Sequence, residues 1–476
     1  FMKIAMIASE INPLVKTGGL ADVVHALSVE LKKKGNDVIC VLPYYRLIAS
    51  KPIRLSPVMD LTIKMGWRKQ IADIHSACID GVTYYVIGSG YYFDRPSVYG
   101  YDDDGERFAF FSLAAMALLN ALSFNPDIVH VHDWQTGMIP SLGKVLYSGA
   151  KCFASTRYVL TIHNPAFKGM LSRSSLGDLY NLPESFVSSG IADFGDGVST
   201  LKCGIMAADK ITTVSPTHRE ELLRFETAQG LDGVLKLRQH DFAGFVNGID
   251  VEEFNPEKDS LLPCPYSTKN LRKGKNEARK ELLRLANIPD NHGPLFGLVS
   301  RLTYQKGIDL ILGCAREMLL SGGMLAVLGS GEYPLEQGFE SLRREFPDQV
   351  ALYIGYSDPR AHLIYAASDF FLMPSLFEPC GIGQMIAERY GSLPIARDTG
   401  GLHDTIVSWN GENDAEANGF LFRDYNVDGL RYGIGQAQRV YSDKTLLRRL
   451  CLNAMKTDHS WERSAELYVG LYRSIL

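Results

Sequence analysis

Apolar, strand-like runs alternate with helix-length segments along nearly the whole chain, and this alternation restricts the fold more than any other feature. It predicts parallel sheets whose strands are connected by helices. The runs fall into two series, so we expect an α/β protein with two doubly wound, Rossmann-like domains. The first series occupies residues 4–8, 37–42, 128–132, 158–162 and 210–214, and the second occupies residues 295–300, 324–328, 350–354, 370–373 and 393–396.

The length of the chain supports a division into domains. At 476 residues the chain exceeds the size at which a single hydrophobic core stops growing, roughly 250 to 300 residues. Turn-forming residues gather at 246–256, so the predicted domains are residues 1–250 and 251–455, followed by a C-terminal helix within 456–476.

Two segments predict additions to these domains. The last helix carries Leu467, Leu471 and Ile475 at helical spacing, so we expect this helix to pack back on the first domain. Residues 57–86 contain three short strand candidates without helices between them. This segment predicts an antiparallel insertion in the first domain.

Composition excludes several classes of partner. The net charge of −5 provides no basic face for nucleic acid or an anionic membrane, so we expect neither as a partner. The longest apolar stretch, 108–122, is shorter than a membrane span and predicts a buried helix. The 8 cysteines form no C-x-x-C pair, which argues against a zinc site and a compact disulfide framework and predicts reduced thiols in a cytoplasm.

The turn after the first strand has the composition of an anion-binding site. Lys16, Gly18 and Gly19 lie between the strand at 4–8 and a helix expected from Val23. Glycines let the backbone approach a ligand and adopt positive φ, while free N–H groups and the helix dipole favour negative charge at a helix start. The alternative is an ordinary turn with a solvated lysine, because Gly-rich strand–helix turns are common.

Charged residues follow two strands of the second domain. Arg301 and Lys306 come directly after the strand at 295–300, at the edge where open parallel sheets bind ligands. Their cations suit a diphosphate, although two solvated surface cations would show the same pattern. Glu378 follows the strand at 370–373, and a carboxylate accepts hydrogen bonds from sugar hydroxyls. A helix-start carboxylate that only serves the helix dipole is the alternative.

Polar residues also end two strands of the first domain. Asp133 follows the strand at 128–132, and His163 and Asn164 follow the strand at 158–162. Side chains at the carboxyl ends of parallel strands are candidates for a binding site. A single histidine at a strand end is more often structural, so neither motif identifies a site alone.

Together the motifs resemble the bacterial glycogen synthase and plant starch synthase family. The resemblance implies a GT-B fold, in which two Rossmann-like domains face each other across a deep cleft. It also implies transfer of glucose from ADP-glucose to the non-reducing end of an α-1,4-glucan, with retention of configuration. The motifs that carry it are, in chain order, Lys16-Thr-Gly-Gly-Leu, His132-Asp-Trp, His163-Asn, Asn247-Gly-Ile-Asp, Arg301 with Gln305-Lys-Gly, Phe377-Glu-Pro-Cys-Gly and Thr399-Gly-Gly-Leu.

The resemblance implies roles for individual residues. Lys16, Arg301 and Lys306 would bind the diphosphate after closure of the two domains, while Glu378 would hold sugar hydroxyls and His163 would contact the 6-hydroxyl of the transferred glucose. ADP-glucose is then a substrate, and neither a cofactor nor a metal is required, because positive groups stabilise the leaving diphosphate. Further substrate contacts are implied for Gly18, Gly19, Asp22, Asp133, Asn164, Asn247, Tyr356, Cys380, Gly381 and Gly383.

Several positions depart from the patterns of related enzymes. Ile386 stands where related retaining enzymes of this fold carry a second glutamate, and Glu388 is out of register with it; the synthase family also lacks that glutamate. Gly383 stands where a threonine is frequent, and Leu376 stands where an arginine can precede Phe-Glu-Pro. Residues 172–200 match only loosely, which leaves the acceptor preference least determined.

Three other functions compete with this interpretation. A dinucleotide-dependent oxidoreductase is disfavoured, because no strand leads into Gly-x-Gly-x-x-Gly with an acidic residue ~20 positions later. A catalytically silent glucan-binding homologue is expected to lack at least one of Lys16, Arg301, Lys306 and Glu378, and all of these are present. A related hexosyltransferase that uses UDP-glucose stays open, because no residue pattern identifies the base.

Overall fold

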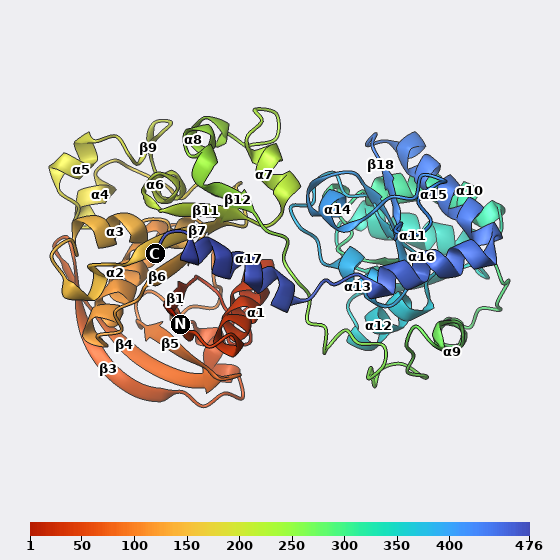
Figure 1. Ribbon diagram of the computed structural model, residues 1–476, viewed down its shortest axis with the longest axis horizontal. Coiled ribbons are helices and arrows are strands. Elements are labelled where there is room, and N and C mark those ends of the chain that lie inside the picture. The colour runs from red at the N-terminus through yellow and green to blue at the C-terminus, as the bar shows by residue number, and fades with distance from the viewer. The chain divides into compact units, whose positions relative to one another are not determined.

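The computed structural model describes residues 1–476 and divides the chain into two compact units. Unit 1 contains Phe1–Val214, Arg219–Phe245 and Trp461–Leu476, and unit 2 contains Ser215–His218 and Val246–Ser460. The main division follows Phe245, a few residues before position 250, and the last helix is part of unit 1. Each unit has its own sheet with helices on its faces (Figure 1).

Unit 1 is built on a nine-stranded sheet with the order β12-β11-β7-β6-β1-β2-β5-β4-β3. The strands from β12 to β5 pair in parallel. β1, β2, β6, β7 and β11 confirm the first predicted series, and β12 was not predicted. Their bounds are β1 (Lys3–Ile7), β2 (Asp37–Pro43), β5 (Val82–Gly88), β6 (Ile128–His132), β7 (Arg157–Ile162), β11 (Lys210–Thr213) and β12 (Phe242–Gly244).

The antiparallel insertion predicted at 57–86 is present, and its strands are joined to the main sheet. β3 (Ser56–Met65) and β4 (Arg68–Ile79) are antiparallel, and β4 is antiparallel to β5. The other edge of β5 pairs in parallel with β2, so the hairpin extends the main sheet. A small separate sheet contains β8 (Met170–Leu171), β9 (Asp193–Phe194) and β10 (Gly197–Ser199).

Helices cover the sheet of unit 1. The stretch predicted as a buried helix is α2, which is buried along most of its length. No helix in the structure is both long and apolar enough to cross a membrane. The helices begin and end as α1 (Gly19–Lys33), α2 (Asp104–Ala121), α3 (Ile139–Val145), α4 (Ser175–Asp178), α5 (Glu184–Ser188), α6 (Thr200–Ala207), α7 (Pro216–Leu222), which runs on from unit 2, α8 (Asp232–Leu237) and α17 (Trp461–Arg473).

The C-terminal helix α17 packs on unit 1, which confirms the prediction for this segment. Ala465, Tyr468, Val469 and Tyr472 are buried, Leu471 and Ile475 are partly buried against the same core, and Leu467 is 46% exposed. The Tyr472 hydroxyl lies 2.6 Å from Nδ1 of a buried histidine of β6. Figure 1 shows α17 beside α1.

Unit 2 is built on a six-stranded, fully parallel sheet with the order β15-β14-β13-β16-β17-β18. Its first five strands in chain order confirm the second predicted series, and β18 was not predicted. The strands are β13 (Leu295–Val299), β14 (Met324–Gly329), β15 (Val350–Ile354), β16 (Phe370–Met373), β17 (Leu393–Arg397) and β18 (Phe420–Phe422). The helices are α9 (Leu271–Ala286), α10 (Ile308–Leu320), α11 (Tyr333–Glu345), α12 (Asp358–Ala367), α13 (Gly383–Arg389), α14 (Gly400–Thr405), α15 (Val427–Ser442) and α16 (Lys444–Lys456).

Candidate active site

In each sheet the parallel strands have a switch point, where the strand order continues on the other side of the first strand, and candidate residues lie there. At such a switch point the chain leaves the two central strands toward opposite faces, so ligands bind at the carboxyl ends of these strands. The switch point lies between β1 and β6 in unit 1 and between β13 and β16 in unit 2. Lys16 and Asp133 follow the first pair of strands, and Arg301 and Glu378 follow the second pair.

The loop after β1 is ordered by a buried carboxylate that sequence reasoning missed. Glu10 is only 2% exposed, and it accepts hydrogen bonds from Thr17 Oγ1 at 2.5 Å and from the Gly18 N–H at 3.1 Å. The Tyr99 hydroxyl also donates to Glu10, at 2.9 Å. The available signal was an acidic residue shortly after a buried strand at a switch point. Glu10 thereby fixes the backbone immediately before α1.

Lys16 and the diglycine lie at the start of α1. Lys16 Nζ is 2.5 Å from a carboxylate oxygen of Asp22, and both side chains are partly exposed. Neither glycine adopts the positive φ that glycine permits: Gly18 is extended, with φ −158°, and Gly19 is not left-handed either. A Cβ on either glycine would meet no atom within 4 Å. Because the two glycines carry no side chain, they leave open space for a ligand beside the unpaired N–H groups at the start of the helix.

The turn after β6 holds Asp133 in a strained backbone conformation. Its φ of 58° is rare for a residue other than glycine. The carboxylate accepts hydrogen bonds from the N–H groups of His163 at 2.7 Å and Asn164 at 3.2 Å, which ties this turn to the turn after β7. Burial raises the pKa of Asp133 to about 7, although these two hydrogen bonds favour the ionised form.

Three histidines lie side by side on β6 and directly after β7. The buried rings of His130 and His132 stack with centroids 4.4 Å apart, and His132 Nδ1 is 3.0 Å from His163 Nε2. Burial lowers the pKa of His130 and of His163 to about 3, and it lowers the pKa of His132 well below its ordinary value. All three imidazoles are therefore neutral at pH 7. Asn164, next to His163, is exposed.

In unit 2 the switch point brings a lysine and a glutamate into contact. Lys306 Nζ lies 2.7 Å from Glu378 Oε2, and the Ser375 hydroxyl donates to the same oxygen at 3.1 Å. The side chain of Glu378 is 9% exposed and that of Lys306 is 18% exposed. Arg301 is exposed and makes no ion pair. The site thus offers the unpaired cation of Arg301 together with the ion pair of Lys306 and Glu378.

Glycines on a neighbouring turn hold the backbone of Glu378. Gly400 has φ +46°, and a Cβ there would lie 1.9 Å from the Glu378 carbonyl oxygen. The N–H of Gly401 donates to this carbonyl at 3.0 Å. Only glycine combines a left-handed conformation with such a close approach. The predicted strand–diglycine–helix turn at 399–401 thus serves to place Glu378.

Gln384, which sequence reasoning missed, closes the loop after Glu378. This fully buried amide donates to the carbonyls of Cys380 and Gly381, both at 3.0 Å. Burial raises the pKa of Cys380 to about 12, so its thiol stays protonated and is no nucleophile. Asn247 is 7% exposed, and its backbone N–H is directed at this thiol. Cys380 and Asn247 therefore lie together beneath the loop.

The departures at Gly383 and Leu376 have structural counterparts. A Cβ at Gly383 would lie 3.3 Å from Phe371 Cε1, so a threonine would press on the sheet. The Leu376 carbonyl accepts a hydrogen bond from Arg397 Nη1, and the Leu376 N–H donates to the Gln305 carbonyl at 2.8 Å. A guanidinium group from β17 thus supports the peptide that precedes Phe377-Glu378.

Comparison with known proteins decides the family. Residues 3–237 match the family model of the starch synthase catalytic domain, and residues 280–453 match that of group 1 glycosyl transferases. A glycogen synthase from Anoxybacillus flavithermus is 42% identical over 477 residues, covering 100% of this chain and 98% of that protein. The chain belongs to the glycogen synthase family. A glycogen synthase from Bacillus cereus (strain B4264) is 42% identical over 478 residues, covering 100% of both chains.

Solved structures agree with this family and with the predicted fold. The catalytic domain of starch synthase IV from Arabidopsis thaliana, bound to ADP and acarbose, superposes with a TM-score of 0.89 at 35% identity. The match covers 100% of this chain and 99% of that one. Sucrose-phosphate synthase from Thermosynechococcus elongatus, at 18% identity and a TM-score of 0.59, shares the fold alone, covering 99% of this chain and 98% of that one. The protein is a GT-B glycosyltransferase with two Rossmann-like domains.

Two further residues of this glycogen synthase family member lie apart from the Lys306–Glu378 pair. Tyr356 follows the edge strand β15, and its side chain is 75% exposed. Its hydroxyl donates to the carboxylate of Asp358, which raises the pKa of Tyr356 to about 12. Glu388 is buried in α13 with Oε2 at 2.5 Å from His459 Nε2, so the glutamate that is out of register has a structural partner.

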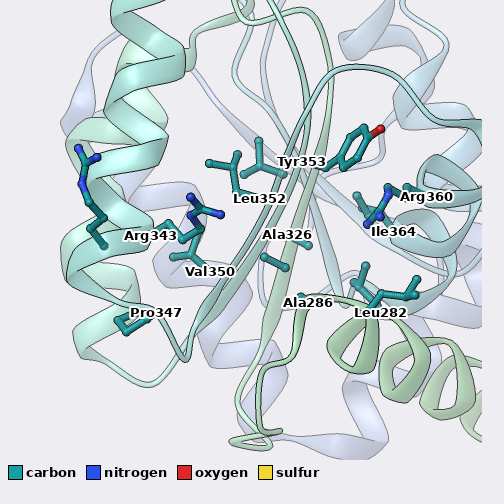
Figure 2. Close-up of a pocket in the computed structure, with 14 residues that line it drawn as sticks. Leu282, Ala286, Ala326, Arg343, Pro347, Val350, Leu352, Tyr353, Arg360 and Ile364 are labelled. Atoms are coloured by element: carbon teal, nitrogen blue, oxygen red, sulfur yellow. The ribbon is translucent and has the colours of Figure 1, made fainter.

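A cavity of about 510 Å³ lies elsewhere in unit 2, along the outer edge of β15. Figure 2 shows Arg343 and Arg360 on opposite sides of the strand that carries Leu352 and Tyr353. None of the candidate residues lines this cavity. Charged side chains along an open strand edge prevent pairing with other chains. This role accounts for Arg343 and Arg360, so the cavity needs no ligand to explain them.

Proposed function

We propose that this protein transfers glucose from ADP-glucose to the non-reducing end of an α-1,4-glucan with retention of configuration. The observation that carries the proposal is the contact of Lys306 with Glu378 at the switch point of unit 2, in the same turn region as the unpaired Arg301. These groups offer positive charge for a diphosphate and an acceptor for sugar hydroxyls. The starch synthase IV structure, which contains ADP and acarbose, supports the choice of donor and acceptor.

In this reaction the bond between glucose C1 and the diphosphate oxygen breaks, and a bond forms between C1 and the 4-hydroxyl oxygen of the acceptor. Negative charge increases on the departing diphosphate, so Arg301, Lys306 and Lys16 act where the charge develops. The departing oxygen takes the proton of the acceptor hydroxyl on the same face of the sugar, which preserves the configuration. The protein then positions the reactants and neutralises charge, and needs no nucleophile of its own.

Lys306 has two partners in this proposal. In the free site its ammonium group lies 2.7 Å from Glu378. A bound diphosphate competes for the same ammonium, and Glu378 then has more capacity to accept hydrogen bonds from sugar hydroxyls. The ion pair therefore holds both side chains in place before the donor arrives, which lowers the cost of ordering them.

The residues of unit 1 complete the proposed contacts. His163 contacts the 6-hydroxyl of the transferred glucose, and Asp133 lies on the acceptor side. Lys16 and the N–H groups at the start of α1 bind the diphosphate. Further substrate contacts are proposed for Gly18, Gly19, Asp22, Asn164, Asn247, Tyr356, Cys380, Gly381 and Gly383, where Cys380 contributes its backbone.

The proposal assigns no cofactor or metal to the reaction. Three cationic side chains supply the positive charge that the diphosphate requires, and ADP-glucose is consumed as a substrate. We place the reaction in the cytoplasm, which agrees with the reduced state of all cysteines.

A donor comparison tests the proposal. With glycogen at a fixed concentration, the purified protein should release ADP from ADP-glucose faster than UDP from UDP-glucose, and the new linkage should be α-1,4. Lys16→Ala should lower the rate strongly, whereas Lys33→Ala, at the opposite end of α1, should not. Faster turnover of UDP-glucose would identify the related hexosyltransferase, and no release from either donor would leave a silent glucan-binding homologue.

A further inference from the structure

We propose that His132 is a positioning residue that fixes the tautomer of His163, so that His163 presents an N–H donor at Nδ1 to the bound sugar. The inference rests on the proposed function, because it deepens the role given there to His163. It follows from the contact between His132 Nδ1 and His163 Nε2, which are 3.0 Å apart.

The contact allows only two arrangements of protons. Both imidazoles are neutral, so each carries one proton, and only one of the two facing nitrogens can be the donor. If His163 donates from Nε2, the proton of His132 is on its own Nε2. If His132 donates from Nδ1, its Nε2 carries no proton, and the proton of His163 is on Nδ1.

The surroundings of His132 decide between the two arrangements. Its ring is fully buried, and Nε2 has no hydrogen-bond partner. Buried N–H donors without a partner are rarer in proteins than under-satisfied acceptors. The arrangement that leaves a bare Nε2 is therefore favoured, and His132 donates from Nδ1.

The ring of His132 is held so that it keeps this contact. Thr136 Oγ1 accepts from the His132 N–H and donates to the His132 carbonyl, both at 2.8 Å. One face of the ring stacks on His130 with an interplanar angle of 23°. His130 is itself held by Tyr472 and Thr161, each at 2.6 Å from one of its ring nitrogens. These contacts hold the His132 ring in one orientation, with Nδ1 directed at His163 Nε2.

The consequence concerns the free side of His163. No protein group bonds to its Nδ1, so the proton there is available to a ligand oxygen. An isolated neutral imidazole exchanges between tautomers, and the wrong one offers a lone pair instead of a donor. His132 removes this ambiguity before the substrate binds, without touching the substrate.

The test is the position of the proton on His163, read from two-bond ¹H–¹⁵N correlations in ¹⁵N-histidine-labelled, full-length protein. His163→Gln identifies the signal by its loss. We expect the wild-type proton on Nδ1, the same state in His132→Asn, whose amide N–H replaces the donor, and mixed tautomers in His132→Leu. His362→Leu is the control, because it removes a buried histidine of unit 2 that contacts neither His132 nor His163.

Kinetics provide the second measurement. His132→Leu should lower kcat about tenfold, the equivalent of one hydrogen bond, with little change in the KM for ADP-glucose. His132→Asn should restore most of the loss, and His362→Leu should keep kcat near wild type even where it lowers Tm.

A wild-type proton on Nε2 overturns the inference, as does His132→Leu with unchanged tautomer and kcat. Because the spectrum of the wild type needs no substrate, it decides the tautomer even if a variant fails to fold. Absence of glucosyl transfer would refute the proposed function and leave the spectroscopic result standing.

Discussion

The two switch points hold their candidate residues by different means. In unit 1, buried side chains organise the turns: Glu10 binds the loop of Lys16, and Asp133 binds the turn of His163. In unit 2, the close approach of one backbone to another places Glu378, with Gly400 against its carbonyl. Substitutions should therefore fail for different reasons in the two units, through lost hydrogen bonds in one and through steric conflict in the other.

The largest expected effect is the loss of Glu378. Glu378→Gln removes the charge that Lys306 pairs with and weakens acceptance from sugar hydroxyls, so kcat should fall on the order of 100-fold. Steady-state ADP release with glycogen measures it. Glu388→Gln is the control. Glu388 lies in α13, the helix that follows Glu378, where it is buried against His459 and does not contact Glu378. Equal losses in both variants would show that Glu378 acts through folding.

The second prediction compares two glycines that begin helices. Gly400→Ala places a Cβ 1.9 Å from the Glu378 carbonyl oxygen at φ +46°, which should lower the free energy of unfolding by roughly 3 kcal/mol. Gly18→Ala places its Cβ in open space at an extended φ, so unfolding should be unchanged and only donor binding should weaken. Denaturant unfolding and the KM for ADP-glucose separate the two outcomes. A stable, active Gly400→Ala variant would remove the contrast between the units.

The third prediction uses one carboxyl group in each unit. Burial raises the pKa of Asp133 from 3.8 to about 7 and that of Glu388 from 4.5 to about 7. In this window the folded state keeps a proton that the unfolded state has lost, so each group makes stability fall as pH rises from about 4 to 7, by up to about 1.4 kcal/mol per pH unit. Below and above the window their contributions are constant.

Asp133→Asn and Glu388→Gln should each flatten this dependence in urea unfolding measured between pH 4 and 8. The two variants should differ in activity, because Asp133 ties together two turns of the candidate site and Glu388 does not. An unchanged dependence in either variant would show that the carboxyl is ionised throughout the range. Equal kcat for both would place Asp133 outside the site.

The fold could be predicted because the sequence pattern behind it, an apolar run followed by a helix-length segment, is local and repeats along the chain. Each parallel strand is a short apolar run between helix-length segments, and one run alone is enough to identify a strand. The register of β5 depends on β2, which lies some forty residues earlier, so no local pattern shows that the hairpin continues the main sheet. The buried face of α17 likewise depends on His130, which the helix sequence does not contain.

For the candidate site, residue types were more predictable than their supports. Lys306 and Glu378 follow strands that meet at one switch point, and the rule for parallel sheets brings them together. Glu10 and Gln384 support the loops from several residues away. Glu10 is marked only by its place shortly after a buried strand, and nothing in the neighbourhood of Gln384 marks it. The diglycines look alike in sequence, yet Gly400 is left-handed and Gly18 is extended, because only Gly400 lies against another backbone.

The smallest expected effect lies at the far end of the histidine row in unit 1. Tyr472→Phe removes one hydroxyl and leaves His130 Nδ1 unpaired, which should lower the free energy of unfolding by about 1 kcal/mol. Leu467→Ala, on the exposed face of α17, should change it much less, since Leu467 is 46% exposed. Urea unfolding of both variants compares the two faces. A larger loss for Leu467→Ala would show that Leu467 is packed in solution and that the hydrogen bond of Tyr472 to His130 contributes little to stability.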